Sequence, residues 1–247
     1  MKDLKLLIWT HPSYNDIWPM FFGQLKKHAS FFQEQTVMVP EHSYSLPDTC
    51  KEIRNNENEP YYKRFMESVG RVKEKYVLIL FEDYILYDDV DEKAIRKIVD
   101  FLEESEYSFV RLIRSAANGG KRVAESPDLY EIPLNNGSYL FSLQASIWKR
   151  ADVLKLYDFY KPATIQESEV YGTAACRSTN VRGCYTYNNE PKRGRLHYDS
   201  SVFPYMATAI TGGSLGRKAC WLTSHYEQEL QPLFETYNID PAIRGTI

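Results

Sequence analysis

The run YVLILF, residues 76–81, constrains the fold of this chain more than any other stretch. An apolar side chain at every position indicates a strand that is covered on both faces, as the strands of parallel sheets are. Glu82 and Asp83 follow the run directly. Ligands of open α/β sheets bind at the carboxyl ends of the strands. The sequence therefore predicts a buried strand whose acidic end borders the functional cleft.

Strand and helix signals alternate along the rest of the chain. Residues 41–60 indicate an irregular loop, residues 115–136 a long insertion or hairpin, and Asp16 is placed to cap the first helix. The alternation predicts an α/β fold of the Rossmann type, with a mostly parallel central sheet and helices on both faces. The other strands are expected at residues 4–9, 36–39, 108–113, 138–144 and 181–187, and the helices at 17–29, 61–73, 91–104, 148–159 and 167–177.

Bulk composition narrows the class of protein. The 247 residues suffice for one large α/β domain, and the net charge of −3 argues against a dedicated nucleic-acid binder. No apolar run reaches the roughly 18 residues of a membrane span, and the N-terminus lacks a secretion-signal pattern. The cysteines form no CxxC pair and are expected as free thiols of a cytoplasmic protein; they are Cys50, Cys176, Cys184 and Cys220.

The first candidate site is the acidic pair Glu82 and Asp83. Carboxylates directly after a buried strand can hold a divalent cation that bridges nucleotide phosphates, or accept hydrogen bonds from ribose hydroxyls. The plainer alternative is that they end the strand and begin the loop. Asp88, Asp89 and Asp91 precede the next helix, where capping is the expected role.

The turn after the first strand is a second candidate. Thr10, His11 and Tyr14 offer a hydroxyl, an imidazole and a ring that can hold a base or ribose, although a lone surface histidine is the plainer interpretation of His11. Neither GxGxxG nor GxxxxGK[ST] is present in the chain, which argues against a dinucleotide site or a P-loop here.

Two later segments of the chain are further candidates, one for a general base and one for a cluster of basic side chains. Glu167 and Glu169 lie at an expected helix start, where a carboxylate that borders the cleft can act as a general base or simply favour the helix dipole. Arg193, Arg195 and His197 lie in a basic segment around Gly194. Such a segment can close over a pyrophosphate, or it can be a solvated surface loop.

Taken in order, these features resemble one family. The segment SLQASIWKR, residues 142–150, is similar to the acceptor-side segment of sugar transferases that build surface polysaccharides. QESE, residues 166–169, stands where that group carries a Trp-Glu-x-Glu-like stretch, and KRGR, residues 192–195, is similar to its Lys-Gly or Arg-Gly loop. Over roughly residues 4–200 the chain resembles GT-A-fold glycosyltransferases of the bacterial and viral surface-polysaccharide type.

The resemblance implies a single GT-A-like domain over residues 1–247. Residues 1–114 would form the nucleotide-sugar donor half, and residues 138–247 the acceptor half with a C-terminal loop. Its donor site would use Thr10, His11, Tyr14, Glu82, Asp83, Arg193, Arg195 and His197, and its acceptor site Gln144 and Trp148. Glu169, or else Glu167, would deprotonate the acceptor hydroxyl, which would invert the anomeric centre through an oxocarbenium-like transition state.

The resemblance also implies a Mg²⁺ or Mn²⁺ ion at Asp83. Tyr84 follows Asp83, so the chain departs from the Asp-x-Asp motif, and the pair can instead bind ribose. A glycan or lipid-linked acceptor is expected, with the protein cytoplasmic or peripheral at the inner membrane face. Nucleotidyl transfer and a non-catalytic nucleotide- or sugar-binding module remain the alternatives.

Overall fold

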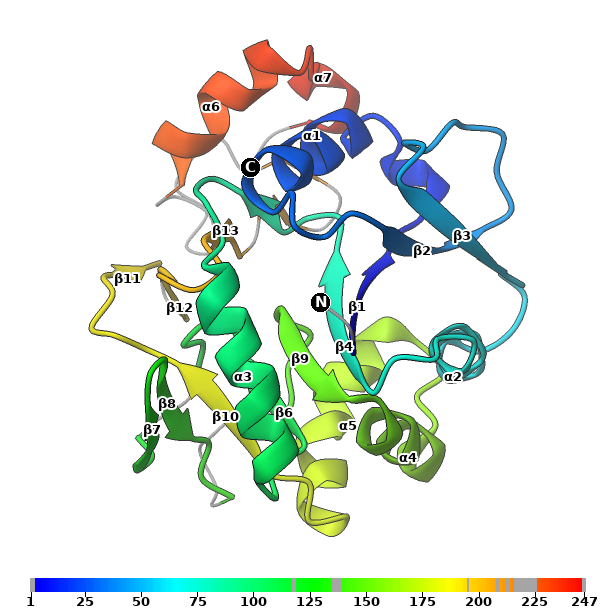
Figure 1. The fold of residues 1–247 in the computed structure, drawn as a ribbon. Coiled ribbons are helices and arrows are strands. Elements are labelled where there is room, and N and C mark those ends of the chain that lie inside the picture. Colours follow the sequence, from blue (N-terminus) through cyan, green and yellow to red (C-terminus); the bar gives the residue numbers. More distant parts are fainter. Residues whose placement is uncertain are drawn as a thin grey trace.

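The computed structural model describes residues 3–116, 119–134, 139–194, 196–207, 209–211, 214–215 and 226–245 (Figure 1). The helices are α1 (Trp18–His28), α2 (Tyr61–Gly70), α3 (Glu92–Glu104), α4 (Arg150–Tyr160), α5 (Ile165–Ser178), α6 (Glu227–Thr236) and α7 (Pro241–Arg244), with a 3₁₀ turn at Pro12–Tyr14. The strands of the main sheet are β1 (Leu4–Trp9), β2 (Gln35–Pro40), β3 (Cys50–Asn55), β4 (Tyr76–Phe81), β6 (Phe109–Arg111), β7 (Arg122–Glu125), β8 (Asp128–Glu131), β9 (Ser146–Lys149) and β10 (Gly183–Thr186). Short pairs are formed by β5 (Ile85–Leu86) with β13 (Tyr205–Met206), β11 (Lys192–Arg193) with β12 (His197–Tyr198), and β14 (Ile210–Thr211) with β15 (Ser214–Leu215).

The nine-stranded sheet has the order β3-β2-β1-β4-β9-β6-β10-β8-β7. Strands β3, β2, β1 and β4 are parallel neighbours, and β6 is parallel to β10. Strand β9 runs antiparallel between β4 and β6. The carboxyl ends of β1, β4 and β6 therefore meet the start of β9 at one edge of the sheet. The predicted α/β class with a mostly parallel central sheet is confirmed.

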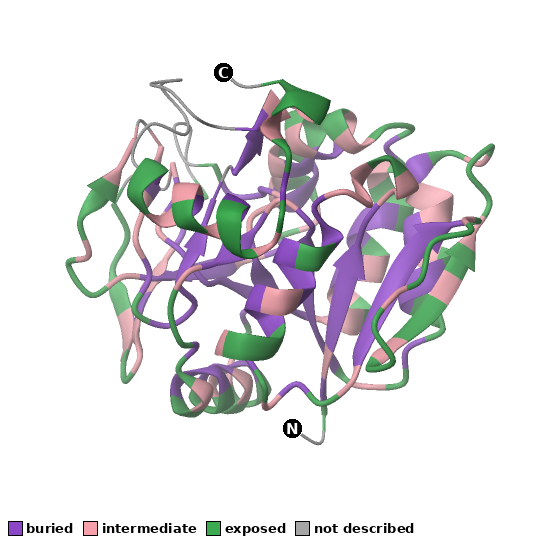
Figure 2. Ribbon diagram, turned by 90° about the horizontal axis from the view of Figure 1, so that it is seen from above, coloured by how far each residue is buried: buried purple, intermediate pink, exposed green. Residues whose placement is uncertain are grey.

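Helices cover both faces of this sheet. In Figure 1, α2, α4 and α5 lie on one face, and α1 and α3 lie on the other. On the first face Phe65 of α2 stacks on Tyr157 of α4, with ring centroids 4.2 Å apart. On the second face the amide of Val90, just before α3, donates to the carbonyl of His28 at the end of α1. Figure 2 shows the resulting layering, with buried central strands and exposed outer helix surfaces.

Strand β4 has the predicted bounds, and all six of its residues are buried. Its register pairs Leu4 with Tyr76 and Trp9 with Phe81, so β1 and β4 end side by side. Asp91 caps α3, as expected, by accepting a 3.0 Å hydrogen bond from the amide of Ala94. The strongest apolar runs thus fold as their patterns indicate.

The strand predicted at residues 138–144 is wrong. The strand is β9, Ser146–Lys149, and residues 139–145 before it are irregular. Trp148 therefore lies in a strand and not in the following helix. Its ring is buried and stacks on Phe109 with centroids 4.2 Å apart, so Trp148 is a core side chain. This burial gives Trp148 a packing role, and acceptor binding by Trp148 stays a prediction.

Two further expectations fail at the sheet edge and at the first helix. Within the stretch expected as loop, residues 50–55 form the edge strand β3, whose exposed face carries polar side chains that hide the strand signal. The cap of α1 is Ile17, which makes no side-chain cap bond. Asp16 instead binds Arg244 of α7, near the C-terminus. A distant tertiary contact therefore replaces the predicted local cap.

No helix in the described part of the chain is long and apolar enough to cross a membrane. Cys50, Cys176 and Cys184 are free thiols, as expected, whereas Cys220 lies outside the described residues. The segment predicted as an insertion or hairpin contains a hairpin, formed by β7 and β8.

Candidate active site

A cavity of about 560 Å³ lies at the sheet edge where β1 and β4 end and the chain approaches β9. It brings together five of the residues predicted for the site: Tyr14, Glu82, Asp83, Gln144 and Glu169. The remaining lining residues are Phe81, Tyr84, Leu143, Ile165, Gln166, Ala207 and Ile210. The cavity therefore joins the acidic end of β4 to the first turn of α5.

Glu82 is the most deeply placed carboxylate of the cavity, with 7% of its surface exposed. Burial, and secondarily the charge of Asp83, raises the pKa of Glu82 to about 8, against the opposing charge of Arg244 and a hydrogen bond from Thr10. The hydroxyl of Thr10 also accepts a 2.9 Å hydrogen bond from the indole of Trp18. Thr10 thus supports Glu82 from beneath and is not among the residues that line the cavity.

Asp83 is half-buried and follows Glu82 at the end of β4. Burial, followed by the charge of Glu169, raises the pKa of Asp83 to about 7. The carboxyl groups of Glu82, Asp83 and Glu169 line the same cavity. Because their pKa values are raised, Glu82 and Asp83 retain protons at neutral pH that ordinary carboxylates would lose. Such a site favours partners that offset negative charge, either hydroxyl donors or a cation.

Glu169 and Glu167 have separate roles although they share the start of α5. Oε1 of Glu169 accepts a 3.0 Å hydrogen bond from the amide of Leu143, and its other oxygen has no donor among the described residues. Oε2 of Glu167 accepts from the amide of Ala163 at 2.7 Å, while its own amide donates to Thr164. Glu167 therefore forms a capping arrangement and does not line the cavity.

Two aromatic contacts fix the walls of the cavity. Tyr205 donates a 2.8 Å hydrogen bond from its hydroxyl to Oε1 of Gln144, which orients that amide. The guanidinium of Arg244 lies 4.4 Å from the ring centroid of Tyr14. Burial and the charges of Glu82 and Asp83 raise the pKa of Tyr14, so its hydroxyl remains a hydrogen-bond donor.

Other predicted site residues lie away from the cavity lining. His11 hydrogen-bonds Glu57 and Ser13, both at 2.8 Å, on the surface. Arg193 pairs with Glu229 and lies over the ring of Tyr226, so the side chain is engaged with α6 and not with the cavity.

His197 lies buried beside Ser115. Burial and the nearby charge of Arg111 lower the pKa of His197 to about 4, which leaves the imidazole neutral. Arg195 lies outside the described residues. Neither the buried neutral His197 nor the paired Arg193 forms the solvated basic loop considered from the sequence.

Local sequence patterns do not reveal Arg244 or Tyr205 as neighbours of the site. The contact between Arg244 and Asp16 joins residues 228 positions apart. Tyr205 follows the irregular segment before β13 and has no periodic pattern around it. The abundance of tyrosine, 19 of 247 residues, is a compositional signal for Tyr205 alone, and it does not distinguish site residues from core residues.

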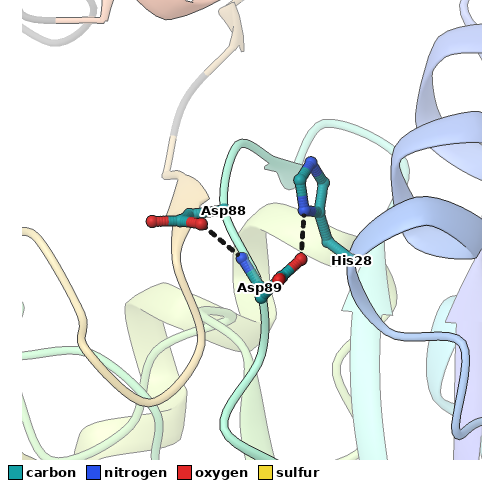
Figure 3. A group of neighbouring side chains, drawn as sticks. All are labelled: His28, Asp88 and Asp89. Atoms are coloured by element: carbon teal, nitrogen blue, oxygen red, sulfur yellow. Dashed lines mark hydrogen bonds and ion pairs between the residues drawn. The ribbon is translucent and has the colours of Figure 1, made fainter.

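Two other features of the molecule lie outside this cavity. A larger cavity of about 680 Å³ borders α1, and its side chains are mainly apolar or uncharged, with no carboxylate. Figure 3 shows His28, Asp88 and Asp89, whose potential ligand atoms lie within 4.8 Å of one another. Asp89 bonds His28 through its carboxylate and Asp88 through its amide, both at 2.8 Å. These hydrogen bonds account for the grouping.

Comparison with known proteins gives a likeness of fold alone. No family model matches the chain, and no curated protein matches it. A cytidylyltransferase from Leptospira borgpetersenii is similar over 98% of this chain and 96% of its own, at 14% identity and a TM-score of 0.49. A putative glucose-1-phosphate thymidylyltransferase from Bacillus anthracis is similar over 95% of each chain, at 11% identity and a TM-score of 0.49.

A third similar structure is residues 1–349 of TarS from S. aureus. The match covers 80% of this chain but only 60% of the TarS chain, at 16% identity and a TM-score of 0.46. Similarity at these identities and TM-scores concerns the general path of the backbone and does not assign an activity.

Proposed function

We propose that this protein is a glycosyltransferase that moves a sugar from a nucleotide-sugar donor to a hydroxyl acceptor. The observation that carries the proposal is the position of Glu169. Its carboxylate faces the cavity that contains Asp83, one oxygen is held by the amide of Leu143, and the other has no donor among the described residues. A fixed carboxylate with an unoccupied oxygen is the arrangement that a general base for a hydroxyl group requires.

In the proposed reaction the donor nucleotide lies near Tyr14, Glu82 and Asp83, and the acceptor lies near Gln144. Glu169 removes the proton of the acceptor hydroxyl while the acceptor oxygen attacks the anomeric carbon. The bond from that carbon to the diphosphate breaks, and the nucleoside diphosphate departs with the bonding electrons. Attack opposite the leaving group inverts the anomeric centre, and the transition state is oxocarbenium-like.

A divalent cation fits the acidic end of β4. Asp83 and Glu82 are hard oxygen donors, and burial, with the charges of neighbouring carboxylates, raises their pKa values, so a cation bound there would stabilise their ionised forms. The described lining of the cavity contains no lysine or arginine that would compensate it. Asp83, with Glu82 behind it, would hold Mg²⁺ or Mn²⁺, and a bound ion would offset the charge of the departing diphosphate.

Among the cations of the chain, we favour Arg244 over Arg193 and His197 as the one that acts on the donor side. Although it pairs with Asp16, its charge lowers the pKa values of Glu82 and Tyr14, whereas Arg193 pairs with Glu229 of α6, away from the cavity lining. Nucleotidyl transfer is the second candidate; its nucleophile, a sugar phosphate, is already ionised and would not need Glu169 as a base. The proposed acceptor is a surface glycan or a lipid-linked precursor.

A donor panel tests the proposal. The protein is incubated with UDP-, GDP-, dTDP- and CMP-sugars, with and without a chelator, and sugar release and thermal stability are measured. Slow hydrolysis of one nucleotide sugar, together with stabilisation by the matching nucleoside phosphate, is expected. Release of pyrophosphate from a nucleoside triphosphate and a sugar 1-phosphate would instead establish nucleotidyl transfer. Binding of a nucleotide without any turnover would indicate a non-catalytic module.

A further inference from the structure

Arg111, the last residue of β6, is fully buried without a matching carboxylate. Its Nη2 donates to the carbonyls of Tyr139 and Leu140 at 2.6 and 3.0 Å. Its Nε and Nη1 atoms are buried and have no hydrogen-bond partner among the described residues. A buried charge normally carries a paired counter-ion, because desolvation of an ion is costly. Placing this guanidinium inside the protein therefore costs stability, which points to a role outside folding.

The two carbonyls belong to the irregular segment 139–144, which lies beside the cavity. Strand pairing does not hold this segment, and side chains hold it instead. Thr173 of α5 accepts from the amide of Phe141 at 3.1 Å, and the hydroxyl of Tyr84 donates to the carbonyl of Leu143 at 2.9 Å. Arg111 fixes the beginning of the same segment. The segment then delivers the amide of Leu143 to Glu169 and the side chain of Gln144 to the cavity.

Charged and titratable groups surround the guanidinium on several sides. Glu169 is the group of this set whose negative charge favours the cation at neutral pH, since burial raises the pKa values of Tyr205, Cys176 and Tyr185 and leaves them neutral. Burial lowers the pKa of Arg111 to about 10, so the group is still a cation at neutral pH. On a further side lies His197, whose neutral ring avoids placing a second charge beside it. The carboxyl group in this set is that of the proposed base, Glu169.

We propose that Arg111 is a positioning residue for Glu169. Its Nη2 group donates to two consecutive carbonyls of segment 139–144, and so fixes the amide that orients the carboxylate. The proposal rests on the proposed function, in which Glu169 is the general base. It predicts that loss of Arg111 impairs the chemical step and leaves donor binding intact, since Tyr14 and Asp83 lie on other elements.

The test compares Arg111→Met and Arg111→Lys with the matched control Arg114→Met. Arg114 lies on the same stretch of chain, between the rings of Tyr187 and Tyr198 at 4.4 and 4.6 Å. Arg111→Met is expected to lower kcat about 10- to 100-fold with the KM for the donor unchanged. Its Tm is expected to stay the same or rise, because an unpaired buried charge is removed. The control is expected to keep its kcat.

Arg111→Lys retains the charge, but its shorter side chain ends before the position of Nη2 and reaches the two carbonyls poorly, so a partial loss of kcat is expected. The amide of Leu143 should exchange its hydrogen faster in both variants. Folded variants with wild-type kcat and unchanged exchange would overturn the proposal. Failure of both variants to fold would show a purely structural role and would overturn it as well.

A double variant separates this proposal from the proposed function. If Glu169→Gln lowers the rate of transfer strongly but measurably, adding Arg111→Met should cause little further loss, because both changes act on the same step. A further large loss would show that Arg111 acts elsewhere and would overturn the positioning role. If Glu169→Gln alone keeps near-full activity, the assignment of the base fails, while faster exchange of the Leu143 amide would still report whether Arg111 fixes the segment.

Discussion

Arg244 and Asp16 form an ion pair that joins helix α7 to the loop before helix α1. Nε of Arg244 donates to Oδ2 of Asp16 at 2.8 Å, and Nη2 donates to Oδ1 at 2.5 Å. Both side chains are largely buried, with exposed fractions of 9% and 17%. The pair holds the guanidinium over the ring of Tyr14, one wall of the candidate active site. The C-terminal helix α7 is thus part of the support of the site.

Removing this pair should destabilise the fold and should also remove the positive charge that lowers the pKa values of Glu82 and Tyr14. Arg244→Gln is expected to destabilise the fold by about 2 kcal/mol or more, since it leaves Asp16 poorly paired. A double-mutant cycle with Asp16→Asn, followed by chemical denaturation, measures the coupling. Additive effects of the two changes would contradict the role of the pair. Lys27→Gln, on the exposed face of α1, is the control and should be nearly neutral.

The two glutamates at the start of α5 should differ sharply in activity. Glu169→Gln is expected to lower the rate of transfer about 100- to 10,000-fold, because the proposed base is lost while its shape is kept. Glu167→Gln should retain activity and lose at most about 1 kcal/mol of stability from its capping bond. Steady-state kinetics on both variants decides the assignment. Near-full activity of Glu169→Gln would refute it.

The acidic pair should make the protein less stable as the pH rises. The pKa values of Glu82 and Asp83 are raised to about 8 and about 7, so the folded state binds more protons than the unfolded state below those values. Their favourable contribution is complete below the unfolded pKa values and is lost as the pH rises through about 8. The loss amounts to about 1.4 kcal/mol per pH unit for each excess proton.

Thermal melts between about pH 6.5 and 8.5 measure this effect, since this window lies above the usual pKa of a histidine. His197, with its lowered pKa, acts in the opposite direction, but its contribution is lost only as the pH falls through about 4. Glu82→Gln should flatten the decline and stabilise the protein at the alkaline end. Glu57→Gln, on the surface, is the control. A wild-type Tm that rises with pH in this window would contradict the expected titration.

Two glycines should respond oppositely to a methyl group. A Cβ on Gly183 would lie 2.0 Å from the ring of Phe109, which itself stacks on Trp148. Gly183→Ala is therefore expected to destabilise the fold by about 2 kcal/mol or more through overpacking. Gly70, at the end of α2, has no atom within 4 Å of such a Cβ, so Gly70→Ala should be neutral or slightly stabilising. Denaturation midpoints are measured for both variants. Equal shifts from the wild-type midpoint would contradict the predicted clash at Gly183.

The sequence by itself determined the elements whose signals are local. The continuous apolar run of β4 and the capped, amphipathic α3 lie where their patterns place them, because burial on both faces or on one stripe leaves a direct trace in the residue order. The acidic end of β4 was also found in this way. Since parallel strands end at one edge, the rule that ligands bind there selected Glu82 and Asp83, which line the cavity.

Only the tertiary structure decided which of the other polar residues join that pair. Glu167 and Glu169 are alike in sequence, and the amide of Leu143, supplied by a segment predicted as a strand, distinguishes them. Trp148 is in the core because β9 pairs on both sides between β4 and β6. The side chains of Arg111 and Arg244 act through contacts with residues far away in the chain. Such contacts depend on how the sheet and helices assemble, and local periodicity carries no record of them.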